Sequence, residues 1–409
     1  MCKTTIYITS AILLALTVSC TQQKTRNKMG TYGYDADFLK AHAIEFLELY
    51  SPDGQSKVLI APGYQGRVMT TTAAGDAGDS YGWLNYKLIG SGEVSPQFNP
   101  VGGEERFWLG PEGGPFSLYF KPGAEQVYAN WIVPRPIDTE RYDIEHQNSQ
   151  RVKFVKQTRL SNASGTQFDL RIEREISLLN ADELAIVLGR HIPKSVKTVA
   201  YRTDNVITNT GDEAWIREKG LISIWLLCMF NPTPSTTVFI PYATDTEGKI
   251  LNDDYFGKVP EDRLIAKDGI VFFKIDGTYR SKIGLPAGRA KGICGSYDSR
   301  KKVLTILTCT VPEGEAAYVN SKWGHQEESE FYDGDVINSY NDGPVEDGSV
   351  MGPFYEIETS SPGAALTPGA SMRHVQTVIH MQGEDADLDP ILEELFGLNL
   401  AKVSGVFSR

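Results

Sequence analysis

The sequence predicts an all-β protein built as one large antiparallel domain. Three observations support this prediction. In residues 168–179 (FDLRIEREISLL), Phe168, Leu170, Ile172, Ile176 and Leu178 alternate with polar side chains, which is the two-residue period of a strand with one face in water. Similar β-rich runs recur along the chain with turn signals between them. Helical periodicity, by contrast, is scarce.

The other expected strands are short runs rich in β-branched and aromatic residues. They are KVLIAPG (57–63), RVMTTTA (67–73), TVFIPYA (237–243), IVFFKID (270–276), KVLTILTCTV (302–311) and HVQTVIHM (374–381). Turn signals such as Pro52-Asp53-Gly54 and Lys267-Asp268-Gly269 lie between them. Two short helices are expected, at 35–43 and at 387–397, the second capped by Asp387 or Asp389.

Composition is typical of an ordinary globular protein. The 409 residues are 41% hydrophobic, with a formal net charge of −12 and no basic block to offset it. Such a chain repels phosphate backbones, which argues against nucleic-acid binding. No internal repeat and no shift in composition marks a boundary, so a single domain over 35–409 is expected.

The N-terminus predicts export. Residues 1–19 carry an early lysine and an apolar stretch too short to span a bilayer comfortably. Ending on Leu16-Thr17-Val18-Ser19-Cys20, the segment resembles a bacterial lipoprotein signal, which implies a lipid on Cys20 and a flexible tether over 20–34. Thr17 departs from the usual aliphatic residue, and a plain cleaved signal is the alternative. The absence of an acidic residue directly after Cys20 favours the outer membrane by the same resemblance.

The remaining cysteines do not suggest a metal site. Cys228, Cys294 and Cys309 are odd in number and form neither a CxxC pair nor a cluster with histidine. Two of them sit in apolar runs, so buried free thiols are expected rather than the single disulfide that could form. No metal or other cofactor is predicted.

Residues 99–120 (NPVGGEERFWLGPEGGPFSLYF) form the first stretch with binding character. Glycine pairs flank Arg106, Trp108 and Glu112, and glycine permits close approach of the backbone to a ligand. A sugar needs this mixture, an aromatic face for its C–H groups and ionic groups for its hydroxyls. The alternative is a buried loop in which Trp108 belongs to the core and an Arg106–Glu112 ion pair holds the turn.

Residues 319–344 form the second such stretch, rich in polar and aromatic side chains, among them Trp323 and His325. Binding residues often lie on loops of this kind, held by a rigid sheet. The oxygen-rich DGD (333–335) and NDGPVEDG (341–348) segments leave a calcium site open, although neither matches an EF-hand loop. Ordinary Asx-Gly turns are the simpler interpretation.

The segment YEIETS (355–360) reads as a strand that places Glu356 and Glu358 on one face, opposite Tyr355, Ile357 and Thr359. From the residues alone, this is a half-buried strand with an acidic face in water. No GxSxG motif, cysteine–histidine pair or phosphate-binding loop occurs elsewhere in the chain.

Three segments together resemble the galactose mutarotase-like (aldose 1-epimerase-like) superfamily. They are 44–73, similar to its opening hairpin; GGEERFWLGPEGG (102–114), similar to a glycine-rich segment of secreted bacterial branches; and EIETSSPGAALTPGASMRHVQTVI (356–379), similar to its ending. The resemblance implies an antiparallel β-supersandwich with few short helices and a sugar in a groove on its concave face.

The resemblance also assigns roles. Glu358, placed before Pro362 and LTPG, corresponds to the general base that removes the anomeric hydroxyl proton, and Glu356 lies near it, where it either raises the pKa of Glu358 or holds a loop. The superfamily's general-acid histidine is missing, because Trp225 stands where it is expected. His325 is the candidate substitute.

The expected function is therefore carbohydrate binding by an envelope lipoprotein, with Arg106, Trp108, Glu112, Trp225, Trp323 and His325 as binding residues. The expected partners are a saccharide and, through the lipid anchor, a membrane. The alternative is an enzyme acting on a sugar or glycoside with Glu358 as general base. A scaffold without a small ligand is the third possibility, and the residues alone do not decide among them.

Overall fold

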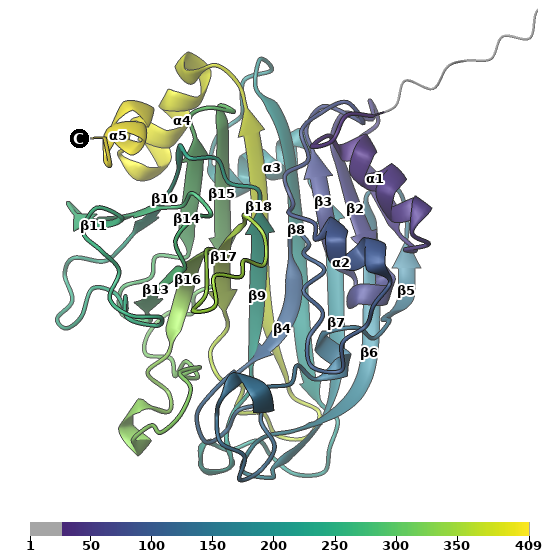
Figure 1. Cartoon of the computed structure of the whole chain (residues 1–409), viewed down its shortest axis with the longest axis vertical. Coiled ribbons are helices and arrows are strands. Elements are labelled where there is room, and N and C mark those ends of the chain that lie inside the picture. Colours follow the sequence, from purple (N-terminus) through teal and green to yellow (C-terminus); the bar gives the residue numbers. More distant parts are fainter. Residues whose placement is uncertain (1–26, 409) are drawn as a thin grey trace, which may run out of the picture.

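The computed structural model describes residues 27–408 as an antiparallel β-sandwich (Figure 1). The signal peptide and Cys20 predicted from the sequence lie outside the described residues. Strands form three sheets, of ten, five and three strands, and each strand runs antiparallel to the strands it pairs with. The predicted fold class is confirmed.

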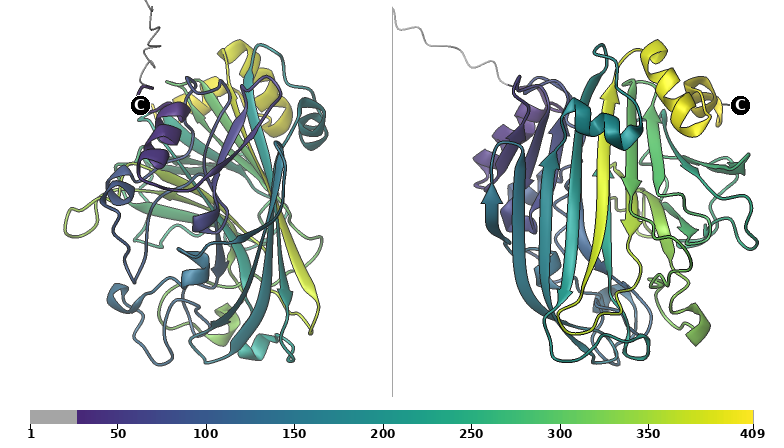
Figure 2. Two further views of the ribbon diagram at one scale, coloured as in Figure 1. Left: turned by 90° about the vertical axis from the view of Figure 1, so that its right-hand side faces the viewer. Right: turned by 180° about the vertical axis from the view of Figure 1, so that it is seen from behind.

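The ten-stranded sheet, called the large sheet here, has the strand order β11-β12-β10-β14-β15-β18-β8-β7-β6-β5. Figure 2 shows its long strands side by side across the back of the molecule. Its strands are β5 (Asp143–Gln147), β6 (Arg151–Ser161), β7 (Gln167–Leu178), β8 (Lys197–Asn209), β10 (Thr236–Pro241), β11 (Leu264–Lys267), β12 (Ile270–Lys274), β14 (Ile293–Asp298), β15 (Val303–Cys309) and β18 (Ser371–Gln382).

The five-stranded sheet, called the small sheet, packs against the large one in the order β13-β16-β17-β9-β4. Its strands are β4 (Arg106–Gly110), β9 (Ser223–Phe230), β13 (Ser281–Pro286), β16 (Asp335–Asn341) and β17 (Tyr355–Ser360). A third sheet, near the N-terminus, consists of β1 (Leu47–Tyr50), β2 (Lys57–Ala61) and β3 (Arg67–Thr72).

Helices are few and short. They are α1 (Tyr32–Ala41), α2 (Tyr86–Ser91), α3 (Ala181–Leu188), α4 (Asp385–Phe396) and α5 (Leu400–Gly405), with 3-10 turns η1 (Pro62–Tyr64), η2 (Tyr128–Asn130), η3 (Arg135–Ile137), η4 (Arg217–Lys219) and η5 (Glu328–Glu330). None of the helices within residues 27–408 is long and apolar enough to cross a membrane.

Alternation along the strands separates two cores. On β18, Val378 belongs to the core between the two sheets, whereas its neighbour Ile379 belongs to a core under the C-terminal helices. In that second core, Leu392 of α4 and Val403 of α5 pack on the far face of the large sheet. The large sheet is therefore covered on both faces over part of its area, and the small sheet is fixed to it through one face only.

Two expectations for chain segments need correction. Glu384, not Asp387 or Asp389, is the N-cap of α4. At the other end of the chain, the Thr31 hydroxyl caps α1 and Tyr32 is fully buried, so residues 31–34 belong with the folded domain rather than with the tether expected up to 34. The three remaining cysteines are free thiols, and Cys228 and Cys294 are buried.

Candidate functional site

The two faces of β17 have different surroundings, as its alternation predicts. Tyr355 hydrogen-bonds to Ser296 of the large sheet, at 2.7 Å between hydroxyl oxygens, and Thr359 donates to Gln376 of the large sheet. These side chains therefore face the interior of the sandwich. Glu356 and Glu358 project from the opposite face of the small sheet, which we call the outer face.

Strand register brings further side chains to the same outer face. Glu358 lies opposite Asn338 of β16 on one side and Leu227 of β9 on the other, and Leu227 lies opposite Arg106 of β4. Along the same face, Trp225 pairs with Trp108 and Lys282 of β13 pairs with Tyr340. Segments separated by as many as 250 residues therefore meet here, between Arg106 and Glu356.

Glu358 is fully buried and is held through one oxygen. Its Oε2 accepts a hydrogen bond from Trp225 Nε1 at 3.0 Å and from Lys282 Nζ at 2.9 Å. Burial acts to lower the pKa of Lys282, but the carboxylates of Glu358 and Glu112 outweigh it and raise that pKa. Lys282 is thus a cation, and its ammonium group and the Trp225 N–H both donate to one oxygen of Glu358.

Glu356 has a different environment two residues away. Its Oε1 accepts one hydrogen bond from Arg106 Nη2 at 3.0 Å, and both side chains are more than nine-tenths buried. The guanidinium of Arg106 stacks on the Trp108 ring, 4.2 Å from its centroid. Burial raises the pKa of Glu356 to about 8, with Arg106 opposing the shift and Glu358 adding to it.

Glu112 is the third carboxyl group of this site. Burial raises its pKa, which the charge of Lys282 lowers and that of Glu358 raises further. Its backbone N–H donates to the Ser321 hydroxyl at 3.0 Å, which ties the 111–114 segment to the loop that carries Trp323. We call Glu112, Glu356 and Glu358, with Arg106 and Lys282, the carboxylate site.

Gly113 allows this contact between loops. A Cβ atom on Gly113 would lie 2.4 Å from the Lys322 backbone oxygen, so only glycine lets the two segments approach so closely. The glycine pair 113-114 therefore brings together two parts of the chain. It does not line an open surface for a ligand, contrary to the role expected from the sequence.

Aromatic rings surround the carboxylate site. Trp108 and Trp225 contact edge to face at 5.5 Å, and Trp131 stacks on Trp323 at 6.0 Å. On the other side, Lys282 Nζ lies 5.2 Å from the Trp225 ring and 5.4 Å from the Tyr255 ring. The charged groups are thus enclosed between flat apolar faces.

Several buried polar atoms in this enclosure have no hydrogen-bond partner within the described part of the chain. They are Glu358 Oε1, Arg106 Nε and Trp108 Nε1. Leaving a buried polar atom unpaired costs about 1–3 kcal/mol, so such atoms call for a water molecule or a ligand group. Glu112, Trp323, Tyr340 and Tyr255 are only half-buried and form the part of the site nearest to the surface.

The structure brings together most of the binding residues expected from the sequence but not all of them. Arg106, Trp108, Glu112, Trp225, Trp323 and Glu358 converge on the outer face. His325 does not join them: its side chain is 84% exposed and contacts Glu327 at 3.0 Å. The alternative Arg106–Glu112 ion pair is also wrong, since Arg106 pairs with Glu356.

Lys282 is the site residue that sequence reasoning missed. It lies in the run SKIGLP, whose single lysine resembles any solvent-facing strand residue. Only the pairing of β13 with β16 brings it beside Glu358. A single lysine in a short strand is too common a pattern to have marked it.

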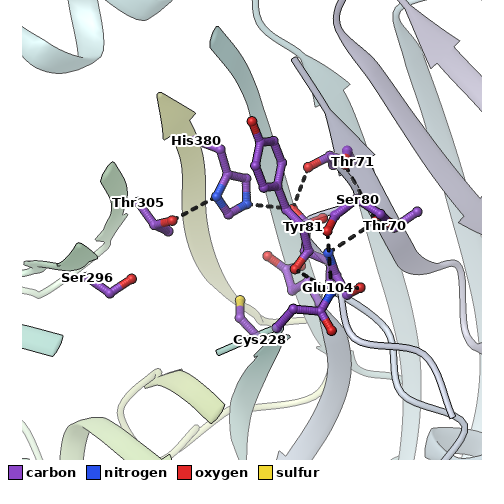
Figure 3. Close-up of polar contacts among 12 residues, drawn as sticks. Thr70, Thr71, Ser80, Tyr81, Glu104, Cys228, Ser296, Thr305 and His380 are labelled. Atoms are coloured by element: carbon purple, nitrogen blue, oxygen red, sulfur yellow. Dashed lines mark hydrogen bonds and ion pairs between the residues drawn. The ribbon is translucent and has the colours of Figure 1, made fainter. Parts of the chain in front are cut away.

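A second polar cluster lies between the sheets, on the inner side. Figure 3 shows Thr305, His380 and Glu104 linked in a row, with Nδ1 of His380 2.8 Å from the Thr305 hydroxyl and Nε2 3.0 Å from Glu104. The order resembles a hydroxyl–imidazole–carboxylate triad. However, all three side chains are at least 97% buried, and the adjoining cavity measures about 20 Å³, room for one water molecule. This cluster satisfies buried polar groups and offers no space for a substrate.

No group of three or more His, Cys, Asp and Glu side chains suited to a metal ion occurs within residues 27–408. Near the segments considered for calcium, Asp335 accepts hydrogen bonds from Asn252 and Tyr255, and Asp342 accepts one from the Gly352 N–H. These carboxylates serve protein donors.

Comparisons with known proteins identify the family. A model described as "Family of unknown function (DUF6786)" matches residues 30–407. The chain belongs to this family. A search of curated proteins found no match.

Solved structures share the fold of this family member. The Slr1438 protein from Synechocystis is 13% identical, with 83% of this chain and 96% of that chain covered and a TM-score of 0.51. A galactose mutarotase-like protein from Lactobacillus casei is 11% identical over 82% of this chain and all of its own, with a TM-score of 0.46. At these identities the similarity concerns the fold alone, and it agrees with the antiparallel β-sandwich described above.

Proposed function

We propose that the outer face of the small sheet binds a saccharide at the carboxylate site. The observation that carries the proposal is the enclosure of three carboxyl groups and two cations between tryptophan rings, with unpaired polar atoms among them.

Sugars present two kinds of surface, and the site has a counterpart for each. Hydroxyl groups both donate and accept hydrogen bonds, so they suit the free carboxylate oxygen of Glu358 and the free N–H groups of Arg106 and Trp108. The C–H faces of a pyranose suit the Trp225 and Trp323 rings. Loops that meet at Gly113 carry Trp323 and Glu112 toward the surface, where a ligand would enter.

A direct test is a thermal-shift and calorimetric screen of the protein, purified in mild detergent, against monosaccharides and oligosaccharides. We expect a saturable hit, and a Trp323→Ala variant should bind it about tenfold more weakly through loss of an aromatic contact. Tyr50→Ala removes a half-exposed ring on β1 and is the matched control. No hit across the panel would contradict the proposal and favour a scaffold without a small ligand.

Enzymatic action on the bound sugar is the second candidate. It is favoured by two neighbouring carboxyl groups in different environments, Glu358 beside Lys282 and Glu356 beside Arg106, because such pairs supply a base and an acid. Turnover of the screened sugar by the parent protein, together with its loss in Glu358→Gln, is the expected result for an enzyme. Binding without turnover is the result for a binding protein.

We also propose that the protein works at the cell envelope, in the outer membrane, through a lipid on Cys20. Support comes from the sequence alone: an apolar segment, a small residue before the cysteine and a polar segment after it. One acyl chain anchors a protein only marginally, whereas the several chains of a bacterial lipoprotein give stable attachment. A Cys20→Ser variant should leave the membrane fraction or stall in maturation.

A further inference from the structure

We propose that the carboxylate site binds one end of an oligosaccharide and that the sugars which follow lie on an aromatic surface at Tyr128. This inference rests on the proposed function and adds to it the class of ligand, a glycan chain rather than a single sugar. A row of aromatic rings that joins this surface to the carboxylate site carries the inference.

Large apolar side chains are exposed on two neighbouring segments, the loop after α2 and the segment around η2. They are Val94, Val127, Tyr128 and Ile132, with Tyr128 64% exposed, and we call them the apolar patch. Hydrogen bonds join the two segments: the Gln97 side chain donates to the Tyr128 backbone oxygen at 2.5 Å, and the Val133 N–H donates to the Gln97 backbone oxygen at 2.9 Å. Apolar side chains gathered at the surface in this way mark a site of interaction.

A row of rings leads from the apolar patch to the carboxylate site. Tyr128 stacks on Trp131 with 5.9 Å between ring centroids and 22° between planes, and Trp131 stacks on Trp323 at 6.0 Å and 29°. Trp131 also lies 6.3 Å from Trp108, the ring that carries the Arg106 guanidinium. Tyr128 and Trp323 reach the surface, whereas Trp131 between them is buried. The row therefore has one ring at the carboxylate site and one beyond it.

The character of this surface favours a glycan over a second protein or a lipid. Rings that lie close to parallel in a row suit the C–H faces of successive sugars in a chain. Polar groups accompany the rings: Trp131 Nε1 is buried without a hydrogen-bond partner among the described residues, and the Asn130 side chain is exposed. Sugar hydroxyls supply both donors and acceptors for such groups, which a lipid chain or an apolar protein surface does not.

The segments that carry the row are fixed to one another without a ligand. The Gln126 side chain accepts hydrogen bonds from the Gly114 N–H at 2.9 Å and the Gly324 N–H at 2.8 Å, and it donates to the Gly114 carbonyl oxygen at 2.7 Å. It thus ties the segment of Tyr128 to the loops of Glu112 and Trp323. Because such a surface loses little conformational entropy when it binds, contacts with Tyr128 should add directly to affinity.

The dependence of affinity on glycan length tests this inference. The probes are glucose, xylose and mannose, each with the matching hexasaccharide (cellohexaose, xylohexaose or mannohexaose), titrated calorimetrically into the protein in mild detergent. We expect a hexasaccharide to bind the parent at least about tenfold more tightly than its monosaccharide. Tyr128→Ala should remove this gain without changing the affinity for the monosaccharide, whereas Trp323→Ala should weaken both. Tyr128→Phe keeps the ring and should keep the gain, and Tyr50→Ala is the matched control on β1.

Each contrary result has its own meaning. The exposed position of Tyr128 means that its replacement should leave the fold intact, which the unchanged monosaccharide affinity checks. Equal affinities for monosaccharide and hexasaccharide in the parent, or a gain that survives in Tyr128→Ala, would overturn this inference and leave the proposed function standing. Failure of every sugar to bind would overturn both. A sedimentation coefficient that falls in Tyr128→Ala, with glycan binding unchanged, would assign the apolar patch to contacts between copies of this chain and refute the glycan surface.

Discussion

Replacing Glu356 by glutamine should change how the stability of the protein depends on pH. The pKa of Glu356 is raised to about 8 by burial, against 4.5 for a free glutamate side chain. Between these values the folded chain holds a proton that the unfolded chain has released, so the parent loses stability as the pH rises through this window. Glutamine mimics the protonated group at every pH and removes this dependence.

The size of the effect follows from the two pKa values. At about 1.36 kcal/mol for each pH unit, the interval from 4.5 to about 8 sets an upper bound of about 5 kcal/mol, and water entering the charged site reduces it. We therefore expect the free energies of unfolding of variant and parent to agree near pH 5. At pH 9 the variant should be more stable by about 2–5 kcal/mol.

Urea unfolding at pH 5, 7 and 9, followed by circular dichroism, measures this difference. Asp35, whose pKa burial raises to about 6, titrates in the same window but is present in both proteins and cancels in the comparison. Glu175→Gln controls for a generic change from glutamate to glutamine on a strand. A difference between Glu356→Gln and the parent that stays constant with pH would refute the assigned protonation of Glu356.

Three further predictions concern other parts of the chain. Trp225→Phe removes the indole donor to Glu358 and should lower the free energy of unfolding by about 1.5–3 kcal/mol beyond the loss of ring area; an unchanged value would exclude that hydrogen bond. Arg174→Met leaves the fully buried Glu105 without its cation, 2.7 Å away, and should cost about 3–5 kcal/mol in the same assay, whereas Arg159→Met, at an exposed pair, should cost less than about 1 kcal/mol. Cys20→Ser should move the protein from the membrane fraction to the soluble fraction or stall its maturation, and unchanged fractionation would contradict the lipid anchor.

Most members of the candidate site could be predicted from the sequence. They are tryptophan, arginine and glutamate residues in segments whose composition or resemblance to a known family marked them for attention. Trp225 was notable for standing where the superfamily carries a histidine, and the structure gives that ring a hydrogen bond to Glu358. Lys282 and the Arg106–Glu356 pair were not predictable. Each depends on a contact between distant strands, for which the local sequence contains no signal.

His325 shows the opposite error. Its loop is rich in polar and aromatic residues, and its neighbour Trp323 does pack beside the carboxylate site, on Trp131 and near Glu112. Two residues further on, the imidazole points into solvent. Composition identified the loop correctly, but the direction of a side chain on an irregular segment has no period from which to predict it.

The sequence alone was sufficient for the properties that depend on local periodicity. Alternation over 168–178 marked β7, and the same rule placed Glu356 and Glu358 together on one side of β17. The environments of those two glutamates depended on the tertiary structure, because the partners of a buried carboxyl group come from the strands that pack against it. Strand pairing brings Lys282 and Trp225 to Glu358 and leaves Glu356 with Arg106. Because these side chains are buried, where electrostatic interactions are stronger than in water, these few contacts dominate the environment of each glutamate.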